Sequence, residues 1–142
     1  MSSRFTVIGL AVFSLFSCSQ SMDYSSDDLS SGWTYADVLQ FNIEDKPIIE
    51  ELEIMVNHDM GYGYENLYLK LDLTDENQTI SDTISIQLAD SKGLWMSSCS
   101  GTECQLKYSY AHAGKNIKSI SIAQFSREET LSGINKIGIN LK

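Results

Sequence analysis

Two cysteines at a short spacing are the clearest sign of side-chain chemistry in this sequence. Cys99 and Cys104 enclose Ser-Gly-Thr-Glu, and Gly101 within this segment can adopt the positive φ of a tight turn. The two thiols could then face each other across a hairpin, so the spacing predicts a disulfide in an oxidising compartment. Two reduced cysteines in a loop, or a metal or redox site, are the alternatives, and a zinc site would need two more ligands.

The chain has two histidines, His58 and His112, and neither completes a recognisable site. His112 is the nearer one to the cysteines, but a single imidazole does not complete a zinc site. His58 is followed by Asp59 and could act as a base. No nucleophile is visible beside it, so a surface histidine is the simpler interpretation.

Acidic residues crowd one predicted turn, which contains Asp72, Asp75, Glu76 and Asn77. Oxygen ligands of this kind suit calcium, but the segment lacks the EF-hand spacing, so a solvated turn is the simpler interpretation. No pair of carboxylates stands at a spacing that marks a glycosidase. We therefore predict that the protein is not an enzyme and has no catalytic residue, no cofactor and no metal site.

Aromatic residues offer a different kind of surface. Five of them could form a platform for sugars or a protein-binding hot spot: Trp33, Tyr62, Tyr64, Tyr68 and Trp95. Aromatic side chains of β-proteins more often belong to the core, and both interpretations stay open. Arg127 could anchor a partner, although an ion pair with Glu128 or Glu129 is the simpler expectation.

The segments that must position these side chains alternate between apolar and polar residues with a period of two. The alternating segments are 38–43, 51–56, 67–73, 83–88, 106–110, 119–122 and 136–141. One apolar and one polar face per segment is typical of antiparallel strands that are covered on one side. The sequence therefore predicts an all-β fold: a single antiparallel β-sandwich over residues 32–142, jelly-roll-like or immunoglobulin-like, with about seven or eight strands.

Residues 1–17 have the features of a secretory signal peptide. Arg4 precedes an apolar run, 5–16, which as a helix would rise about 18 Å and is too short for roughly 30 Å of hydrocarbon. Leu15-Phe16-Ser17-Cys18 then resembles the lipobox of bacterial lipoproteins, in which a peptidase cuts before the cysteine and fatty acids such as palmitate are attached to it. We predict Cys18 as the lipidation site; a plain secretory signal with an incidental cysteine is the alternative.

Residues 18–31 are rich in Ser and Asp and are predicted to form a flexible tether between the lipid and the domain. Ser19 follows the cysteine, where Asp would resemble an inner-membrane retention signal, so we expect a cell-envelope lipoprotein of the outer membrane. The periplasmic face is favoured. Acidic residues after Cys18 resemble the surface-export signals of some Bacteroidota lipoproteins and leave the cell surface as the alternative.

The charge of the chain limits its partners. The formal net charge is -9, from 10 basic and 19 acidic residues. Phosphate backbones repel such a chain, so we predict no nucleic-acid partner. The expected partners are the membrane, through the lipid anchor, and other envelope proteins.

Residues spread over the chain resemble the GldH family of gliding-motility lipoproteins from Bacteroidota. The similar positions are Trp33, Asp37, Val38 and Phe41; the Tyr-x-Tyr-x-Asn-Leu motif with Tyr62, Tyr64, Asn66 and Leu67; Asp82, Thr83, Leu88, Asp90, Gly93 and Trp95; and a closing Gln-x-x-Arg and Leu-x-Gly-Ile pattern with Gln124, Arg127, Leu131, Gly133 and Ile134. The chain departs from the family at three places. It reads Val56-Asn57-His58 where the family usually has an arginine, residues 96–99 replace a glycine-rich segment, and Ser126 stands where the family often has methionine.

The resemblance implies a process and not a reaction, because the family is implicated in gliding motility and in the linked type IX secretion apparatus. We therefore expect a non-enzymatic accessory or scaffold component that acts through a sheet face or an exposed edge. The alternative is a carbohydrate-binding surface lipoprotein with an aromatic platform. Asp82-Thr83-Ile84 resembles the short O-glycosylation site of Bacteroidota, which would place a glycan on Thr83.

Overall fold

The structure is a computed structural model that describes the backbone of residues 22–43 and 49–142, and the side chains of these residues except Met22 and residues 112–115. The predicted signal peptide, the lipidation site Cys18 and the side chain of His112 lie outside this description. Within it there is no helix long and apolar enough to cross a membrane.

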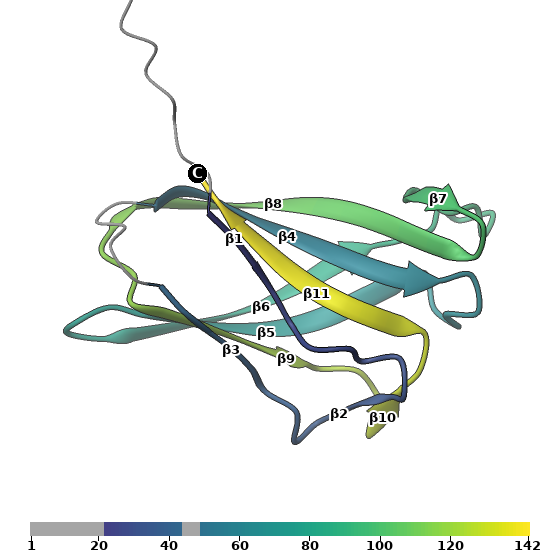
Figure 1. Cartoon of the computed structure of the whole chain (residues 1–142), viewed down its shortest axis with the longest axis horizontal. Helices are drawn as coiled ribbons and strands as arrows, with labels where there is room; N and C mark the ends of the chain where they lie inside the picture. Colours follow the sequence, from purple (N-terminus) through teal and green to yellow (C-terminus); the bar gives the residue numbers. More distant parts are fainter. Residues whose placement is uncertain (1–21, 44–48) are drawn as a thin grey trace, which may run out of the picture.

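The strands form two layers that pack face to face, as Figure 1 shows. The first sheet has the order β1 (Met22–Ser25), β11 (Ile134–Leu141), β4 (Ile49–Asp59), β8 (Glu103–Lys115) and β7 (Ser98–Ser100). The second sheet has the order β3 (Leu39–Asn42), β9 (Ser119–Gln124), β5 (Asn66–Thr74) and β6 (Thr79–Gln87). A small ladder of β2 (Trp33–Thr34) and β10 (Thr130–Leu131) lies beside one end of the two layers.

The strand pairs are nested along the chain. β5 pairs with β6, β4 with β8, β3 with β9 and β1 with β11, and every pair is antiparallel. A chain paired in this way behaves as one long hairpin that is rolled into two sheets, which is the topology of a jelly roll. The all-β prediction is confirmed, and of its two variants the strand order selects the jelly roll over the immunoglobulin fold.

The core lies between the sheets and comes from the alternating residues. Leu67, Leu69 and Leu71 of β5 are fully buried, while Tyr68 and Lys70 between them face outward. All seven segments that alternate in the sequence are strands in the structure. Burial of each such aliphatic side chain contributes about 1.5–3 kcal/mol, so this inward face stabilises the sandwich.

The prediction of a tether over 18–31 is wrong for residues 22–31, which belong to the folded domain. Residues 22–25 form β1, which pairs with the end of β11, and Leu29 is buried in the core. The Ser26 and Leu29 N–H groups donate to the carbonyl oxygens of Ile137 and Asn135. β1 lies at the edge of its sheet, where polar and charged residues are common, so the composition of this segment gave no sign of a strand.

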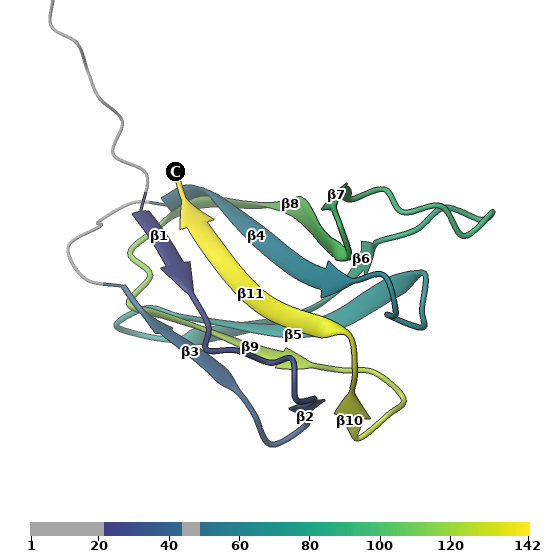
Figure 2. The same ribbon diagram turned by 45° about the vertical axis from the view of Figure 1, so that its right-hand side comes forward.

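The sandwich has two ends, which we name by their relation to the chain termini. The near end holds the start of β1, the C-terminus and the turns 74–79 and 116–119. The far end holds the segments 26–38, 59–66, 87–98 and 124–134. Figure 2 shows β2, β10 and the long β6–β7 connection at the far end, away from the C-terminus.

Candidate functional site

The segment from Tyr62 to Tyr68 forms one wall of the far end and is held by hydrogen bonds within itself. The Tyr62 hydroxyl donates to the Asn66 carbonyl oxygen at 2.9 Å, which closes the turn between β4 and β5. The Asn66 amide donates to the Tyr68 hydroxyl at 3.0 Å. The Tyr62 and Tyr64 rings meet edge to face with centroids 5.7 Å apart. The spacing of this motif therefore fixes the position of Tyr68.

Gly133 leaves the space that Tyr62 needs. Its φ is +88°, and a Cβ atom placed there would lie 2.8 Å from the Tyr62 Cα atom. Any other residue would combine a strained backbone with a clash against main chain. Tyr62 is consequently packed into the core, and burial raises the pKa of its phenol, with the nearby Tyr64 and Glu128 raising it further.

Trp33 and Asp37 support another segment of the far end, 26–38. The Trp33 side chain is fully buried, and its indole N–H donates to the Asp37 carbonyl oxygen at 2.7 Å. The Asp37 carboxylate accepts hydrogen bonds from the Thr34 N–H and hydroxyl, which lower the pKa of Asp37. Trp33 also pairs with Leu131 in the small ladder, so the opening and closing motifs of the chain meet here.

Gln124 shapes the loop that carries Arg127. The Gln124 side chain is 3% exposed, and its amide donates to the carbonyl oxygens of Glu128 and Glu129 at 3.1 and 3.2 Å. Its side-chain oxygen accepts bonds from the Ser126 N–H and hydroxyl at 2.9 and 2.7 Å. The glutamine of the Gln-x-x-Arg pattern therefore acts as the internal support of the loop, and the arginine is presented on it.

A hollow of about 240 Å³ lies between this loop and the tyrosine wall. It is lined by Tyr62, Tyr64, Asn66, Tyr68, Ser126 and Arg127. The Tyr64 and Tyr68 rings are about two-fifths exposed. Four residues that resemble family motifs thus share one hollow, although the first and last of them, Tyr62 and Arg127, lie far apart in the sequence.

The charges at the hollow are not arranged as the sequence suggests. The expected ion pair of Arg127 with Glu128 or Glu129 is wrong, because within the described ranges Arg127 has no carboxylate at salt-bridge distance. The Glu128 carboxylate acts instead on Tyr64, whose pKa it raises. Arg127 is exposed and lines the hollow.

A tight turn at 90–94 positions Trp95 against the sandwich. The Asp90 carboxylate accepts hydrogen bonds from the N–H groups of Lys92 and Leu94 at 2.8 and 2.9 Å, and Gly93 takes a φ of +77°. Trp95 then forms a bridge with Ala89, and its ring lies against His58 at a tilt of 53°, with ring centroids 4.6 Å apart.

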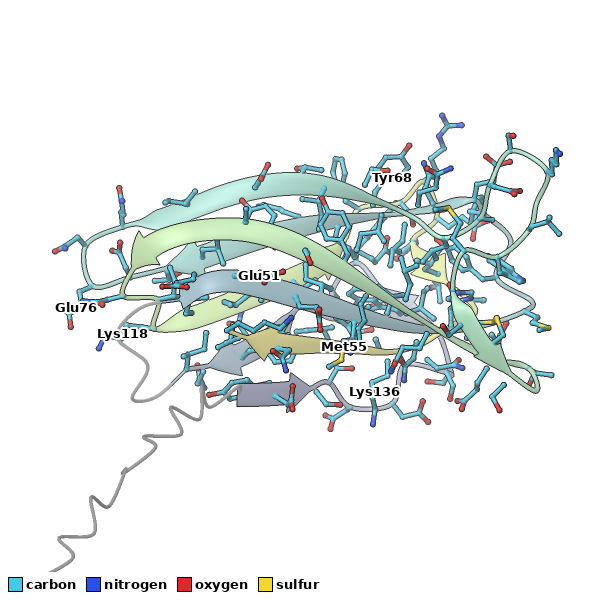
Figure 3. All side chains as sticks on the ribbon, turned by 90° about the horizontal axis from the view of Figure 1, so that it is seen from above. Glu51, Met55, Tyr68, Glu76, Lys118 and Lys136 are labelled. Carbon is cyan, nitrogen blue, oxygen red and sulfur yellow. A yellow bond between two sulfur atoms is a disulfide. The ribbon has the colours of Figure 1, made fainter. Side chains whose placement is uncertain are left out.

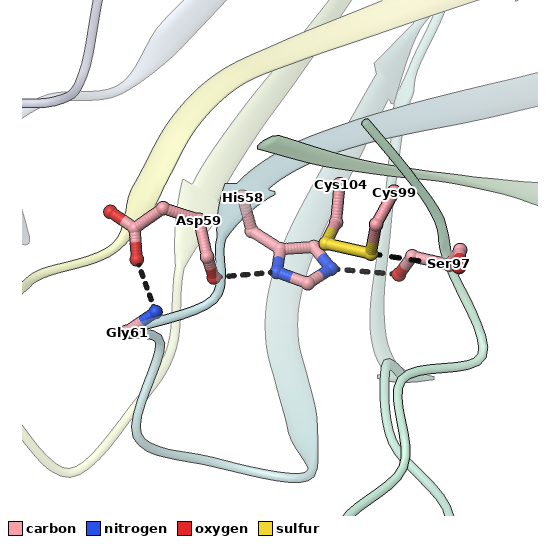
Figure 4. The surroundings of a disulfide bond; sticks show 6 residues. All are labelled: His58, Asp59, Gly61, Ser97, Cys99 and Cys104. Atoms are coloured by element: carbon pink, nitrogen blue, oxygen red, sulfur yellow. Dashed lines mark hydrogen bonds between the residues drawn. A yellow bond between two sulfur atoms is a disulfide. The ribbon is translucent and has the colours of Figure 1, made fainter. Parts of the chain in front are cut away.

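His58 is buried, so its interpretation as a surface histidine is wrong. It lies on β4, where it continues the inward-facing series of Leu52, Ile54 and Val56. Figure 4 shows its two ring nitrogens engaged on opposite sides: Nδ1 is 3.0 Å from the Asp59 carbonyl oxygen and Nε2 is 2.7 Å from the Ser97 hydroxyl. Burial costs little here because both ring nitrogens are satisfied.

The His58–Ser97 contact is the one arrangement that sequence reasoning missed and that resembles catalytic chemistry. Since Asp59 contributes a carbonyl oxygen, Nδ1 carries the proton, and in the neutral imidazole Nε2 then accepts a hydrogen bond from the Ser97 hydroxyl. A serine paired with a base is the start of a nucleophilic site. The orienting group is a backbone carbonyl, however, because the Asp59 carboxylate accepts the Gly61 N–H instead. The hollow at Arg127 does not include Ser97.

The two cysteines lie beside this histidine. Cys99 of β7 and Cys104 of β8 are direct cross-strand partners, and their sulfur atoms are bonded to each other. Gly101 between them has a φ of +63°, the conformation that the turn requires. Cys104 also pairs with His58 across β4 and β8, so the disulfide ties β7 to the strand next to the buried imidazole.

The acidic turn lies at the near end, remote from the hollow. Its carboxylates have separate partners: Asp75 accepts the Asn77 and Gln78 N–H groups, Glu76 pairs with Lys118 at 3.3 Å, and Asp72 accepts the Ser81 hydroxyl. Figure 3 shows Glu76 and Lys118 together at one end of the sandwich and Tyr68 toward the other. Across the described side chains, no group of three or more His, Cys, Asp or Glu is arranged to hold a metal ion.

The five-ring aromatic platform is divided between core and surface. Trp33 and Tyr62 are buried, Trp95 is half-buried against His58, and only Tyr64 and Tyr68 are exposed. The Tyr62 and Tyr64 rings are inclined at 68°, so these two do not form a flat row. Tyr35 and Phe125, which the sequence did not single out, add exposed rings close to the hollow.

The possible glycosylation residue, Thr83, is exposed on β6, the edge strand of the second sheet. Asp82 beside it is hydrogen-bonded by the Tyr110 hydroxyl at 2.8 Å, whereas Ile84 is buried. A hydroxyl on an exposed edge is accessible to modification, and the glycan itself stays a prediction.

Comparison with known proteins yields one match. The model of a family described as GldH lipoprotein matches residues 22–141. This range begins at the first residue of β1 and therefore includes the strand that the predicted tether missed. No curated protein and no solved structure matches the chain.

Proposed function

Because the chain belongs to the GldH lipoprotein family, whose members are gliding-motility lipoproteins of the cell envelope, we propose that it is a non-enzymatic scaffold or accessory component of the gliding apparatus and of the associated type IX secretion machinery. It is anchored to the outer membrane through Cys18 and contacts other envelope proteins with its far end.

The convergence of the motif residues at one surface carries this proposal. Tyr62, Tyr64, Asn66 and Arg127 line one hollow, and Gly133 and Gln124 support it from behind. Exposed tyrosine and arginine side chains held by a buried frame are typical of the centre of a protein–protein interface. A frame of this kind would be unnecessary if the far end were only a set of connecting turns.

The His58–Ser97 pair has a structural role in this proposal. Its hydrogen bond joins the first sheet to the segment after Trp95, and the imidazole is completely buried under the indole ring. Both residues stand where the chain departs from the family pattern, so two of the departures contact each other. We infer that the pair replaces a different packing solution at the same place.

Site-specific photocrosslinking in motile cells tests the proposal. A photoreactive amino acid replaces Tyr68 at the hollow or, as a matched exposed control, Glu76 at the near end. We expect position 68, and not position 76, to crosslink to gliding or secretion proteins that mass spectrometry identifies. If gliding and type IX secretion persist without this protein and position 68 yields no such partner, the proposed function is wrong.

Carbohydrate binding is the second candidate, favoured by two exposed phenol rings beside the Asn66 amide in one hollow. A glycan array probed with the purified lipoprotein and with Tyr68→Ala separates the two. Binding of a defined oligosaccharide that Tyr68→Ala abolishes would favour this alternative.

A further inference from the structure

We propose that the far-end hollow binds an extended peptide segment of a partner protein and that Arg127 anchors an acidic side chain of that peptide. The inference rests on the proposed function, because it names the ligand chemistry of the same surface. Three observations support it: Arg127 has no described ion pair, aromatic rings surround it, and the hollow is small with a loop held in place by hydrogen bonds.

Arg127 stands out by its charge. It is the only arginine beyond residue 4 in a chain with a formal net charge of -9. Lys70, Lys107, Lys118 and Lys142 are in ion pairs with nearby carboxylates. Arg127 forms none with any residue that the structure describes, which it shares with Lys92 and Lys136, but of these three only Arg127 lines the hollow. A guanidinium offers a planar fork of donors that fits a carboxylate with two parallel hydrogen bonds.

The surroundings of Arg127 are aromatic. Tyr64 and Tyr68 line the hollow with it, and Phe125, two residues before it, is 61% exposed. The Phe125 N–H donates to the Tyr68 carbonyl oxygen at 2.8 Å, and the Tyr35 hydroxyl donates to the Ser126 carbonyl oxygen at 2.6 Å. The Phe125 backbone and the Tyr35 hydroxyl are therefore held beside the hollow, where the exposed rings offer apolar contact to residues that flank the acidic side chain.

The size of the hollow favours a side chain over a whole ligand. Its volume of about 240 Å³ is below the range of roughly 300–1,000 Å³ that is typical of small-molecule pockets. An uncharged sugar would leave the guanidinium without a counterion. A phosphate group would meet a single arginine beside Glu128 and Glu129, so the singly charged carboxylate of a peptide is the better match.

The loop around Arg127 is also organised before binding. Gln124 and Ser126 hold residues 126–129 through bonds to their backbone groups, and Gln124 itself is buried. A ligand that meets a fixed loop loses less conformational entropy on binding than one that must order it. The backbone of Arg127 is therefore already held in place before a ligand binds.

An array of randomised octapeptides tests the inference, with one position fixed as Asp, Glu, Asn, Gln or Lys. The probe is the full acylated protein in detergent micelles, bound at low and at high salt. We expect peptides with Asp or Glu to bind at least 10-fold more strongly than the matched Asn or Gln peptides, and this difference to shrink at high salt.

Three variants assign the preference to the hollow. Arg127→Gln should remove the acid preference, and Arg127→Lys should retain only part of it, because a lysine lacks the planar fork. Lys92→Gln removes another exposed cation of the far end, outside the hollow, and should leave the preference unchanged within twofold. Arg127 is exposed and makes no described ion pair, so its variants should fold, and circular dichroism checks this.

Equal binding of acid and amide peptides would overturn the inference, and so would an acid preference that survives in Arg127→Gln. Loss of the preference in Lys92→Gln would also count against it, since that would indicate a general charge effect. The result is separable from the proposed function: if position 68 crosslinks to motility proteins while the array shows no acid preference, the function stands and only the ligand class is wrong.

Discussion

The two ends of the sandwich are built by different means. At the far end, the buried side chains of Trp33, Tyr62 and Gln124 each donate to backbone carbonyl oxygens, and together they fix long connections between the sheets. At the near end, the connection between β5 and β6 is a short turn closed by Asp75, with the exposed ion pair of Glu76 and Lys118 beside it. The contrast indicates that the far end is a surface supported by buried side chains, whereas the near end mainly links strands.

The two ends also differ in their distance from the predicted lipid anchor. Cys18 is separated from the start of β1 by four residue steps, which reach at most about 14 Å. A tether that continued to residue 31 would have reached about 45 Å. β4 alone has 11 residues and is roughly 35 Å long, so an acylated Cys18 would hold the near end by the lipid and the far end well away from it.

The largest difference that we expect between the ends is in their contact with lipid. Fluorescent probes at Asn77 in the near end and at Ser91 in the far end occupy comparable exposed turns. In vesicles that contain spin-labelled lipids, the Asn77 probe should be strongly quenched and the Ser91 probe hardly at all. Similar quenching at both positions would show that the domain lies flat on the bilayer or is not anchored near β1.

The next largest effect concerns the stability of the far end. Gly133→Ala should lower the free energy of unfolding by about 3 kcal/mol or more, because strain at a φ of +88° adds to the clash with Tyr62. Gly93→Ala is the matched control: its φ is +77°, but an added Cβ would meet nothing within 4 Å, so about 1 kcal/mol is expected. Urea unfolding measures both, and equal losses would show that the contact with Tyr62 is unimportant.

The architecture could be predicted from the sequence further than the site could. The period of two located seven strands because each buries one face. It missed β2, β7 and β10, which have only two or three residues, and the polar edge strand β1. The inward position of His58 could have been predicted, because it continues the alternation of Leu52, Ile54 and Val56. It was assigned to the surface because histidine is itself a polar residue.

The hollow could not be predicted from local sequence patterns. Tyr64 and Arg127 come together only because β5 and β9 pair in the second sheet, and Ser97 reaches His58 across 39 residues. The resemblance to a family indicated most of the residues that line the hollow, but it gave no reason for their spacing. The structure supplies that reason, since Gln124 and Gly133 act through the backbone of other segments.

Gln124→Ala tests the support of the Arg127 loop. The carbonyl oxygens of Glu128 and Glu129 would lose their donor, and the free energy of unfolding should fall by about 2–3 kcal/mol. Gln87→Ala is the control, since Gln87 is exposed and its amide makes one bond, to the Ala89 carbonyl oxygen, so less than about 0.5 kcal/mol is expected. The acid preference of the hollow should weaken with Gln124→Ala alone; if it does not, the loop does not depend on Gln124.

Removal of the disulfide should have a somewhat smaller effect. In the chain-entropy account a loop of this length contributes about 2 kcal/mol, so the double variant Cys99→Ala and Cys104→Ala should unfold at correspondingly lower urea. Adding a reductant should shift the wild-type protein to the same midpoint and leave the double variant unchanged. If reductant leaves the urea midpoint of the wild-type protein unchanged, the disulfide is either absent or does not contribute to stability.

The smallest effect is expected at the near end. Glu76→Gln breaks the ion pair with Lys118, whose side chains are 69% and 57% exposed, and such pairs contribute less than about 0.5 kcal/mol in solvent. The urea midpoint should move little at low salt and not at all at high salt, where the pair is screened. Peptide binding at the far end should be unaffected, because the two ends share no part of the hollow. A loss of several tenths of a kcal/mol at high salt would mean that the near-end turn is supported by more than its charges, and the contrast between the two ends would then be weaker than the hydrogen bonds indicate.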